Sequence, residues 1–145
     1  MRVIVSPEHL KQIEGHGEST YPNEGAGFML GLLADDRIEI NEILPLENQR
    51  EDEAQHNRYE LSPVDFLRAE KEADRLGLSL VGVFHSHPDH PAIPSEFDRD
   101  HAWPHFSYLI SSIQGGKAKV TRAWRLREDR SMFDEDEIQT IKEED

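Results

Sequence analysis

The chain has 145 residues, no cysteine and, with 30 acidic against 16 basic side chains, a formal net charge of −14. This length suits one domain with its own hydrophobic core, the missing cysteines exclude disulfides and thiolate metal sites, and the negative charge argues against nucleic acid as a partner because it repels phosphate backbones. No apolar run reaches the length of a membrane span and the first five residues are too short for a signal peptide, so we expect a cytoplasmic protein without membrane contacts.

The first half of the chain predicts a strand, a helix and a β-hairpin. Ser6 and Pro7 form a helix start, because serine caps helices well and proline fits the first helical position. A pair of aspartates marks the turn between two apolar strands. His9 and His16 on the helix are expected at the surface. The predicted elements are a strand at residues 2–5, a helix from Ser6 to Tyr21, and paired strands at 25–33 and 37–44.

Residues 47–58 carry many charges and no apolar period, which indicates an irregular loop. Two interpretations stay open for this loop. It is either a solvated linker or one edge of a substrate groove, to which His56 or Tyr59 contributes.

The second half predicts two helices and three strands. Ser62 and Pro63 repeat the helix start, and Gly77 ends this helix. Apolar residues at helical spacing form its expected core face: Phe66, Leu67, Ala69, Ala73 and Leu76. The other elements are a buried strand at 80–84, a short helix at 95–102 and strands at 106–113 and 118–126, with Trp103 and Trp124 as expected core aromatics.

The end of the chain is strongly acidic. Residues 128–145 hold nine acidic and two basic side chains, a net of −7. Such a charge run predicts a solvated, fraying tail, although four apolar residues could dock a short helix: Met132, Phe133, Ile138 and Ile141. We therefore expect a domain at residues 1–127 and an acidic C-terminal tail at 128–145.

The buried strand leads into a pair of histidines, His85 and His87. Residues two apart on a strand point to the same side, with Cα atoms roughly 6–7 Å apart. Two imidazoles at that spacing can both bind one zinc ion, because Zn–N bonds are about 2.0–2.1 Å long. A His-x-His pair by itself is more often two ordinary histidines, so a metal site needs further ligands.

Asp98 can supply the third ligand. It lies on the first turn of the short helix that begins at Ser95, after a connection stiffened by three prolines. Two histidines and one aspartate leave a position for water, which is the pattern of a catalytic zinc site. A second interpretation stays open, because Ser95 and Asp98 also fit a capping box in which the carboxylate binds the helix start.

A family resemblance joins these residues. His85, His87, Ser95 and Asp98 stand at the spacing of the full JAMM signature, and Glu24 follows the first helix, where that family has a glutamate. Over residues 1–126 the sequence resembles the small prokaryotic JAMM/MPN+ (Mov34/PAD-1-like) zinc metallopeptidases. The resemblance implies an α/β fold, with a curved, mostly antiparallel or mixed sheet and flanking helices, related to the cytidine-deaminase-like sandwich.

The resemblance also implies a mechanism and a partner. Zinc held by His85, His87 and Asp98 would activate a water molecule. Glu24 would act as the general base and the Ser95 hydroxyl as the oxyanion donor. The expected reaction is hydrolysis of peptide or isopeptide bonds after the C-terminal Gly-Gly of a ubiquitin-like protein or a sulfur carrier of the ThiS/MoaD type.

Other functions compete with this one. Residues 85–90 match His-x-His-x-Asp-His, which resembles the metallo-β-lactamase superfamily, but the further downstream ligands of that superfamily are missing. In the JAMM interpretation Asp89 and His90 are loop residues near the site. Zinc deaminases are excluded because they need a cysteine pair. Two alternatives remain open: a non-catalytic MPN binding scaffold, and a zinc amidohydrolase that acts on a small amide.

Overall fold

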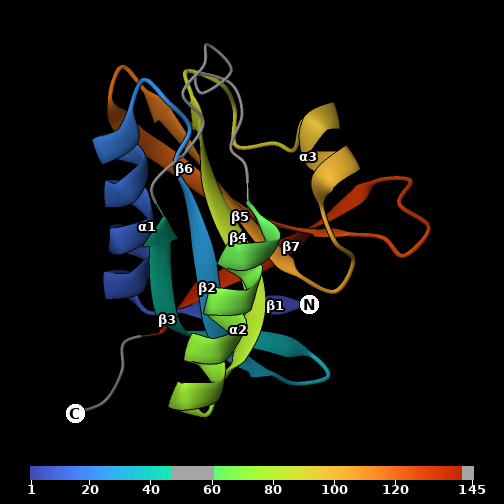
Figure 1. Cartoon of the computed structure of the whole chain (residues 1–145). Helices are drawn as coiled ribbons and strands as arrows, with labels where there is room; N and C mark the ends of the chain where they lie inside the picture. Colours follow the sequence, from blue (N-terminus) through green and yellow to red (C-terminus); the bar gives the residue numbers. More distant parts are fainter. Residues whose placement is uncertain (47–60, 142–145) are drawn as a thin grey trace.

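The computed structural model describes residues 1–46 and 61–141. Within these ranges the chain forms seven strands, with three helices inserted between them (Figure 1). None of the described helices is long and apolar enough to span a bilayer. The elements are β1 (Arg2–Val5), α1 (Pro7–Thr20), β2 (Ala26–Leu33), β3 (Arg37–Leu46), α2 (Pro63–Leu76), β4 (Ser79–Pro88), α3 (Glu96–His101), β5 (Ser107–Gln114), β6 (Lys117–Leu126) and β7 (Phe133–Thr140).

The strands form one sheet that closes on itself in the order β1-β3-β2-β4-β5-β6-β7. The pairs β1–β3, β1–β7 and β4–β5 are parallel, and the other pairs are antiparallel. This confirms the predicted α/β fold with a curved, mixed sheet and flanking helices. Figure 1 shows α1 and α2 on the outside of the sheet, while α3 lies apart from them beside the β6–β7 hairpin.

Two buried apolar clusters connect the sheet to its helices. The first joins α1 to the strands through Val3, Val5, Ile13, Ile38 and Leu109. The second joins α2 to the strands through Phe28, Ala69, Val83 and Tyr108. β4, which carries the histidines, and β2, which follows Glu24, contribute to both clusters, so the predicted site adjoins the buried core.

The helix starts follow the predicted cap chemistry. The Ser6 hydroxyl accepts from the His9 amide at 3.0 Å, and Ser62 forms a complete capping box with Asp65. Gly77 ends α2 in the left-handed conformation with φ 72°, which glycine adopts at no steric cost. The predicted starts of α1 and α2 and the predicted end of α2 are therefore confirmed.

The predicted core face of α2 was too wide. Ala69 and Ala73 are buried and Phe66 is half-buried, but Leu67 and Leu76 are exposed. One side of this helix faces the sheet, and helical spacing alone does not fix how far round the burial extends. His16 of α1 differs in the opposite sense, because its ring is half-buried and meets the edge of Phe84.

The prediction of a fraying tail or a docked helix was wrong for residues 133–140. They form β7, which pairs with β6 on one side and with β1 on the other. A strand between two neighbours gains hydrogen bonds along both edges, so it does not need an apolar sequence. Asp136 is buried within this strand and accepts two hydrogen bonds from the Arg125 guanidinium at 3.1 and 3.2 Å.

Trp103 and Trp124 differ from the expectation of two core aromatics. Trp103 follows α3 and is 59% exposed, so that prediction was wrong. Trp124 is half-buried, and its indole N–H donates to the Ala92 carbonyl at 2.9 Å. Trp124 therefore supports the loop between the two halves of the JAMM signature.

Candidate metal centre and active site

The two predicted histidines lie together near the end of β4. His85 is 1% exposed and His87 is 8% exposed, and their ring centroids are 5.0 Å apart. β2 runs antiparallel to β4, with Ala26 opposite His85. Glu24 stands two residues before Ala26, so this pairing brings the predicted base to the histidines, which are about sixty positions away in the sequence.

Asp98 reaches the same histidines from α3. Its Oδ2 lies 3.1 Å from Nε2 of His87, and its Oδ1 lies 3.5 Å from Nε2 of His85. The capping box is also formed: the Ser95 amide donates to Asp98 Oδ2 at 2.8 Å, and the Asp98 amide donates to the Ser95 hydroxyl at 3.1 Å. The capping box is therefore confirmed, and the same carboxylate also lies beside both histidines.

Glu24 completes a compact group of ligand-type atoms. Its Oε1 is 3.8 Å from Nδ1 of His85. One candidate ligand atom from each of Glu24, His85 and His87 lies within 4.8 Å of the others, and all three residues are buried. Imidazole nitrogens and carboxylate oxygens are a donor set that suits zinc and similar divalent ions, so the residues present fit a metal site.

The electrostatics keep Asp98 in its charged form. Burial by itself would raise the pKa of this carboxyl, but the facing histidines and the Ser95 amide hold the pKa well below its usual range. For His87, burial lowers the pKa, and the hydrogen bond and charge of Asp98 more than offset this, so that the pKa lies above its ordinary value. Each of the two side chains therefore favours the charged form of the other, and the carboxylate form of Asp98 is the form that can bind a cation.

The loop after β4 fixes the orientation of His87. Nδ1 of His87 lies 2.8 Å from the Pro91 carbonyl. A nitrogen beside a carbonyl carries the proton, so in the neutral ring Nε2 keeps the lone pair that a metal requires. The loop is held in turn by the Ser112 hydroxyl, which donates to the His90 carbonyl at 2.6 Å.

Asp89 and His90 do not take the ligand positions of a metallo-β-lactamase. The Asp89 carboxylate accepts from the Tyr21 hydroxyl at 2.7 Å and from the Gly115 amide at 2.8 Å. Asp89 and His90 are both exposed to solvent. Asp89 therefore ties the loop to the end of α1 and to the β5–β6 turn.

Ser86 is a contributor that the sequence interpretation missed. Its hydroxyl accepts from the Gly25 amide at 2.8 Å, and its own amide donates to the Gly25 carbonyl at 3.0 Å. Ser86 lies between the two histidines and Gly25 follows Glu24, so this two-point contact holds the base against the histidine strand. The position of Ser86 inside the His-x-His motif was the available signal.

β4, the strand that carries the histidines, also lines a cavity of about 590 Å³. Val83, two residues before His85 on β4, lines it, and Phe66 and Tyr108 form further parts of its wall. The remaining lining residues are Leu61, Pro63, Glu70, Phe97, His101, Trp103 and Phe106. A largely apolar cavity beside convergent polar side chains is the usual form of a substrate pocket. His56 and Tyr59, the two groove residues that the sequence suggested, lie outside the described residues.

Comparisons with known proteins agree with the fold and the residue pattern. The profile of the family described as prokaryotic homologs of the JAB domain matches residues 6–127. A probable TtuB-protein conjugate cleaving protease from Thermus thermophilus is 33% identical over 109 residues, which cover 75% of this chain and 69% of that protein. A desampylase from Pyrococcus furiosus is 29% identical over 127 residues, which cover 86% of this chain and 82% of that protein.

A solved structure supports the same relationship. The solution structure of a protein from Desulfitobacterium hafniense has a TM-score of 0.84 and 29% sequence identity, and the match covers 97% of this chain and 94% of that one. The relatives named as a protease and a desampylase confirm the prediction of a hydrolase. The chain belongs to the family of prokaryotic JAB-domain homologs, a small member of the JAMM/MPN+ type.

Proposed function

We propose that this protein is a zinc-dependent peptidase or isopeptidase that cleaves after the C-terminal Gly-Gly of a ubiquitin-like or sulfur-carrier protein. The observation that supports it best is the buried group of ligand-type atoms from Glu24, His85 and His87, with the Asp98 carboxylate of α3 beside both histidines. The names of the two curated relatives support a conjugate as the substrate.

His85, His87 and Asp98 would hold the metal. When bound, the ion supplies Lewis-acid chemistry that lowers the pKa of a water molecule and polarises the scissile carbonyl. The chain's own residues do the rest. Glu24, beside the histidines, takes the proton of the attacking water and passes it to the leaving amine.

Ser95 is proposed as the oxyanion donor. It is exposed and stands at the start of α3, and its hydroxyl oxygen accepts from the Asp98 amide. Because that bond uses an oxygen lone pair, the hydroxyl proton stays available to a developing oxyanion. One such donor is typically worth about 3–4 kcal/mol of transition-state stabilisation.

The decisive variants separate metal binding from catalysis. Glu24→Gln is expected to bind zinc normally and to lose conjugate cleavage by about 10²–10⁴-fold, the contribution of a general acid–base group. Asp98→Asn keeps an oxygen that accepts from the Ser95 amide but removes the charge, so zinc affinity should fall. Zinc is measured by competition with a chelator, and cleavage with a Gly-Gly carrier joined to a lysine side chain.

The matched control is Glu8→Gln, which removes a carboxylate from the exposed first turn of α1. Unchanged cleavage by Glu24→Gln would remove the base assignment, and unchanged zinc affinity of Asp98→Asn would leave that residue with the capping role alone. An unmodified, zinc-loaded chain that leaves every carrier conjugate intact would favour the scaffold. If it hydrolyses free small amides instead, the amidohydrolase alternative is favoured.

A further inference from the structure

α3 is too short to hold its own geometry. It spans six residues, Glu96–His101, and isolated helices of that length are unstable in water. The last carbonyls of a helix have no partner inside it. The capping box secures the start of α3, so the position of Asp98 also depends on what secures the end.

Arg130 binds the end of α3 from another element. Its Nη1 donates to the Ala102 carbonyl at 2.9 Å, and its Nη2 donates to the carbonyls of Arg99 at 2.9 Å and Asp100 at 3.2 Å. The planar guanidinium offers several donors in a fixed arrangement, and a cation is favourable at a helix C-terminus. One side chain thus satisfies three carbonyls that the helix leaves open.

The backbone of Arg130 indicates that this contact is costly to arrange. Its φ is 63°, in the left-handed region, where the Cβ of an L-residue other than glycine crowds the backbone. Arg130 lies in the turn between β6 and β7, where its amide donates to the Arg127 carbonyl at 2.9 Å. Glycine would suit the turn better, so the arginine is explained by what its side chain reaches.

The contact is close to Asp98 along the helix. The Ala102 amide donates to the Asp98 carbonyl at 2.9 Å, and the Ala102 carbonyl accepts from Arg130. We propose that Arg130 is a positioning residue, which holds α3 so that the Asp98 carboxylate faces His85 and His87. The residue lies beyond position 127, where the match to the JAB family ends, so the C-terminal hairpin is part of what makes the site in this chain. This inference rests on the proposed metal site.

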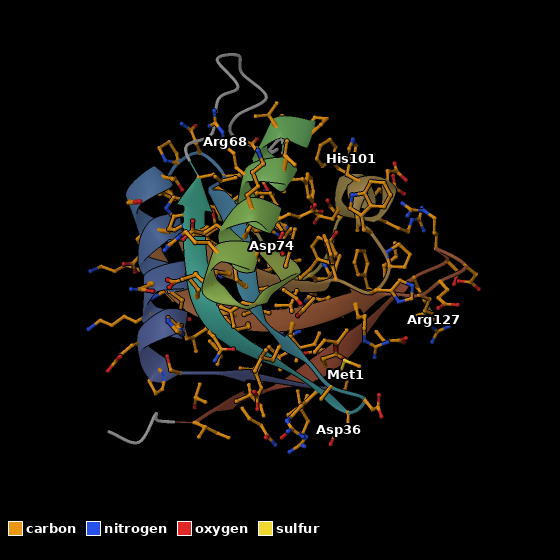
Figure 2. The ribbon with its side chains drawn as sticks, turned by 60° about the horizontal axis from the view of Figure 1, so that its bottom comes forward. Met1, Asp36, Arg68, Asp74, His101 and Arg127 are labelled. Atoms are coloured by element: carbon orange, nitrogen blue, oxygen red, sulfur yellow. The ribbon has the colours of Figure 1, made fainter. Side chains whose placement is uncertain are left out.

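The positive charge of Arg130 gives the positioning role and a purely electrostatic role opposite effects on metal affinity. Removing a cationic side chain near a cation site would, by electrostatics alone, strengthen metal binding. Weaker binding after loss of Arg130 therefore reports lost positioning. Arg127 supplies the matched control, because it lies on the same hairpin (Figure 2). Its guanidinium binds the Asp134 carboxylate on β7, whereas that of Arg130 binds carbonyls at the end of α3.

The experiment compares Arg130→Gly, Arg130→Ala and Arg127→Ala in the full chain. Zinc affinity is measured by chelator competition, and the free energy of unfolding by urea titration of the metal-free protein. Both Arg130 variants should bind zinc about tenfold more weakly, at the lower end of the effect of residues that orient metal ligands. Arg127→Ala should bind zinc as the unchanged chain does. Arg130→Gly should unfold at higher urea than Arg130→Ala, because glycine relieves the left-handed backbone.

Two results would overturn the proposal. One is unchanged zinc affinity in both Arg130 variants; the other is a zinc affinity that follows stability, with the glycine variant close to the unchanged chain and the alanine variant weak.

Hydrogen exchange of the Arg99 and Ala102 amides gives a readout without metal, and both should exchange faster in the two variants. If Asp98→Asn weakens zinc binding and the Arg130 variants do not, the positioning role fails while the metal site stands. If Asp98→Asn has no effect on zinc affinity, Asp98 is not a metal ligand, and that part of the proposed function fails.

Discussion

The hydroxyl of Ser86 illustrates how single residues determine the geometry of this site. Ser86 stands between the two histidines in the sequence, and its buried hydroxyl accepts from the Gly25 amide. A buried amide that loses its acceptor costs about 1–3 kcal/mol. The backbone next to Glu24 is thereby tied to the strand that carries His85 and His87, so the base and the histidines move together.

Ser86→Ala should lower kcat for conjugate cleavage more than it changes KM or zinc affinity, because the histidines stay in place while Glu24 loses its anchor. Stability should fall by about 1–3 kcal/mol. The control is Ser107→Ala on β5, which removes a buried hydroxyl that has no hydrogen-bond partner among the described residues. Equal kcat for the two variants, measured with the same conjugate, would show that the Ser86 hydroxyl does not position the base.

At the scale of elements, the close approach of β4 and β5 depends on a glycine. These strands run parallel, with Gly82 opposite Ser107. A Cβ built on Gly82 would lie 2.1 Å from the Ser107 carbonyl oxygen, a distance that only a backbone shift can relieve. The strand that carries the histidines would therefore have to move to accept any side chain here.

Gly82→Ala is expected to destabilise the fold by about 3 kcal/mol, the upper end of the cost of overpacking. The same substitution at Gly15, on the exposed side of α1 where a new Cβ meets nothing within 4 Å, should instead stabilise by about 0.5–1 kcal/mol, because alanine favours the helix. Urea unfolding of both variants measures the difference. Similar midpoints would mean that β4 and β5 have room to separate.

At the scale of the whole molecule, β7 closes the sheet. It pairs with β1, the first strand of the chain, and with β6. Without it both neighbours would expose a row of unpaired backbone groups. The acidic C-terminal segment therefore connects the first strand of the chain to β6. The hairpin that it forms with β6 also carries Arg130, which binds the end of α3.

A chain that ends after Arg127 should lose cooperative unfolding and zinc affinity together, whereas a chain that ends after Ile141 should keep both. The reason is that the first truncation opens the sheet and releases the end of α3, while the second retains every described strand. Circular dichroism during urea titration and chelator competition measure the two properties. A cooperative, zinc-binding 1–127 fragment would show instead that residues 128–145 are a separable tail.

The sequence by itself determined most of the elements and pointed to the candidate site residues. Caps at Ser6, Ser62 and Ser95 follow from short-range hydrogen bonding, which involves only neighbouring residues. The spacing of His85 and His87 follows from strand geometry. These features are local, so they can be deduced from the residues in order.

Only the tertiary structure decided which distant segments meet. That Ser86 holds Gly25, that Arg130 binds α3 and that an acidic segment becomes a strand are consequences of strand order and closure. Hydrogen bonds between elements far apart in the chain have no period or spacing in the sequence. Their partners become defined only when the sheet brings the elements together, which is why the candidate site residues could be predicted from the sequence and these long-range contacts could not.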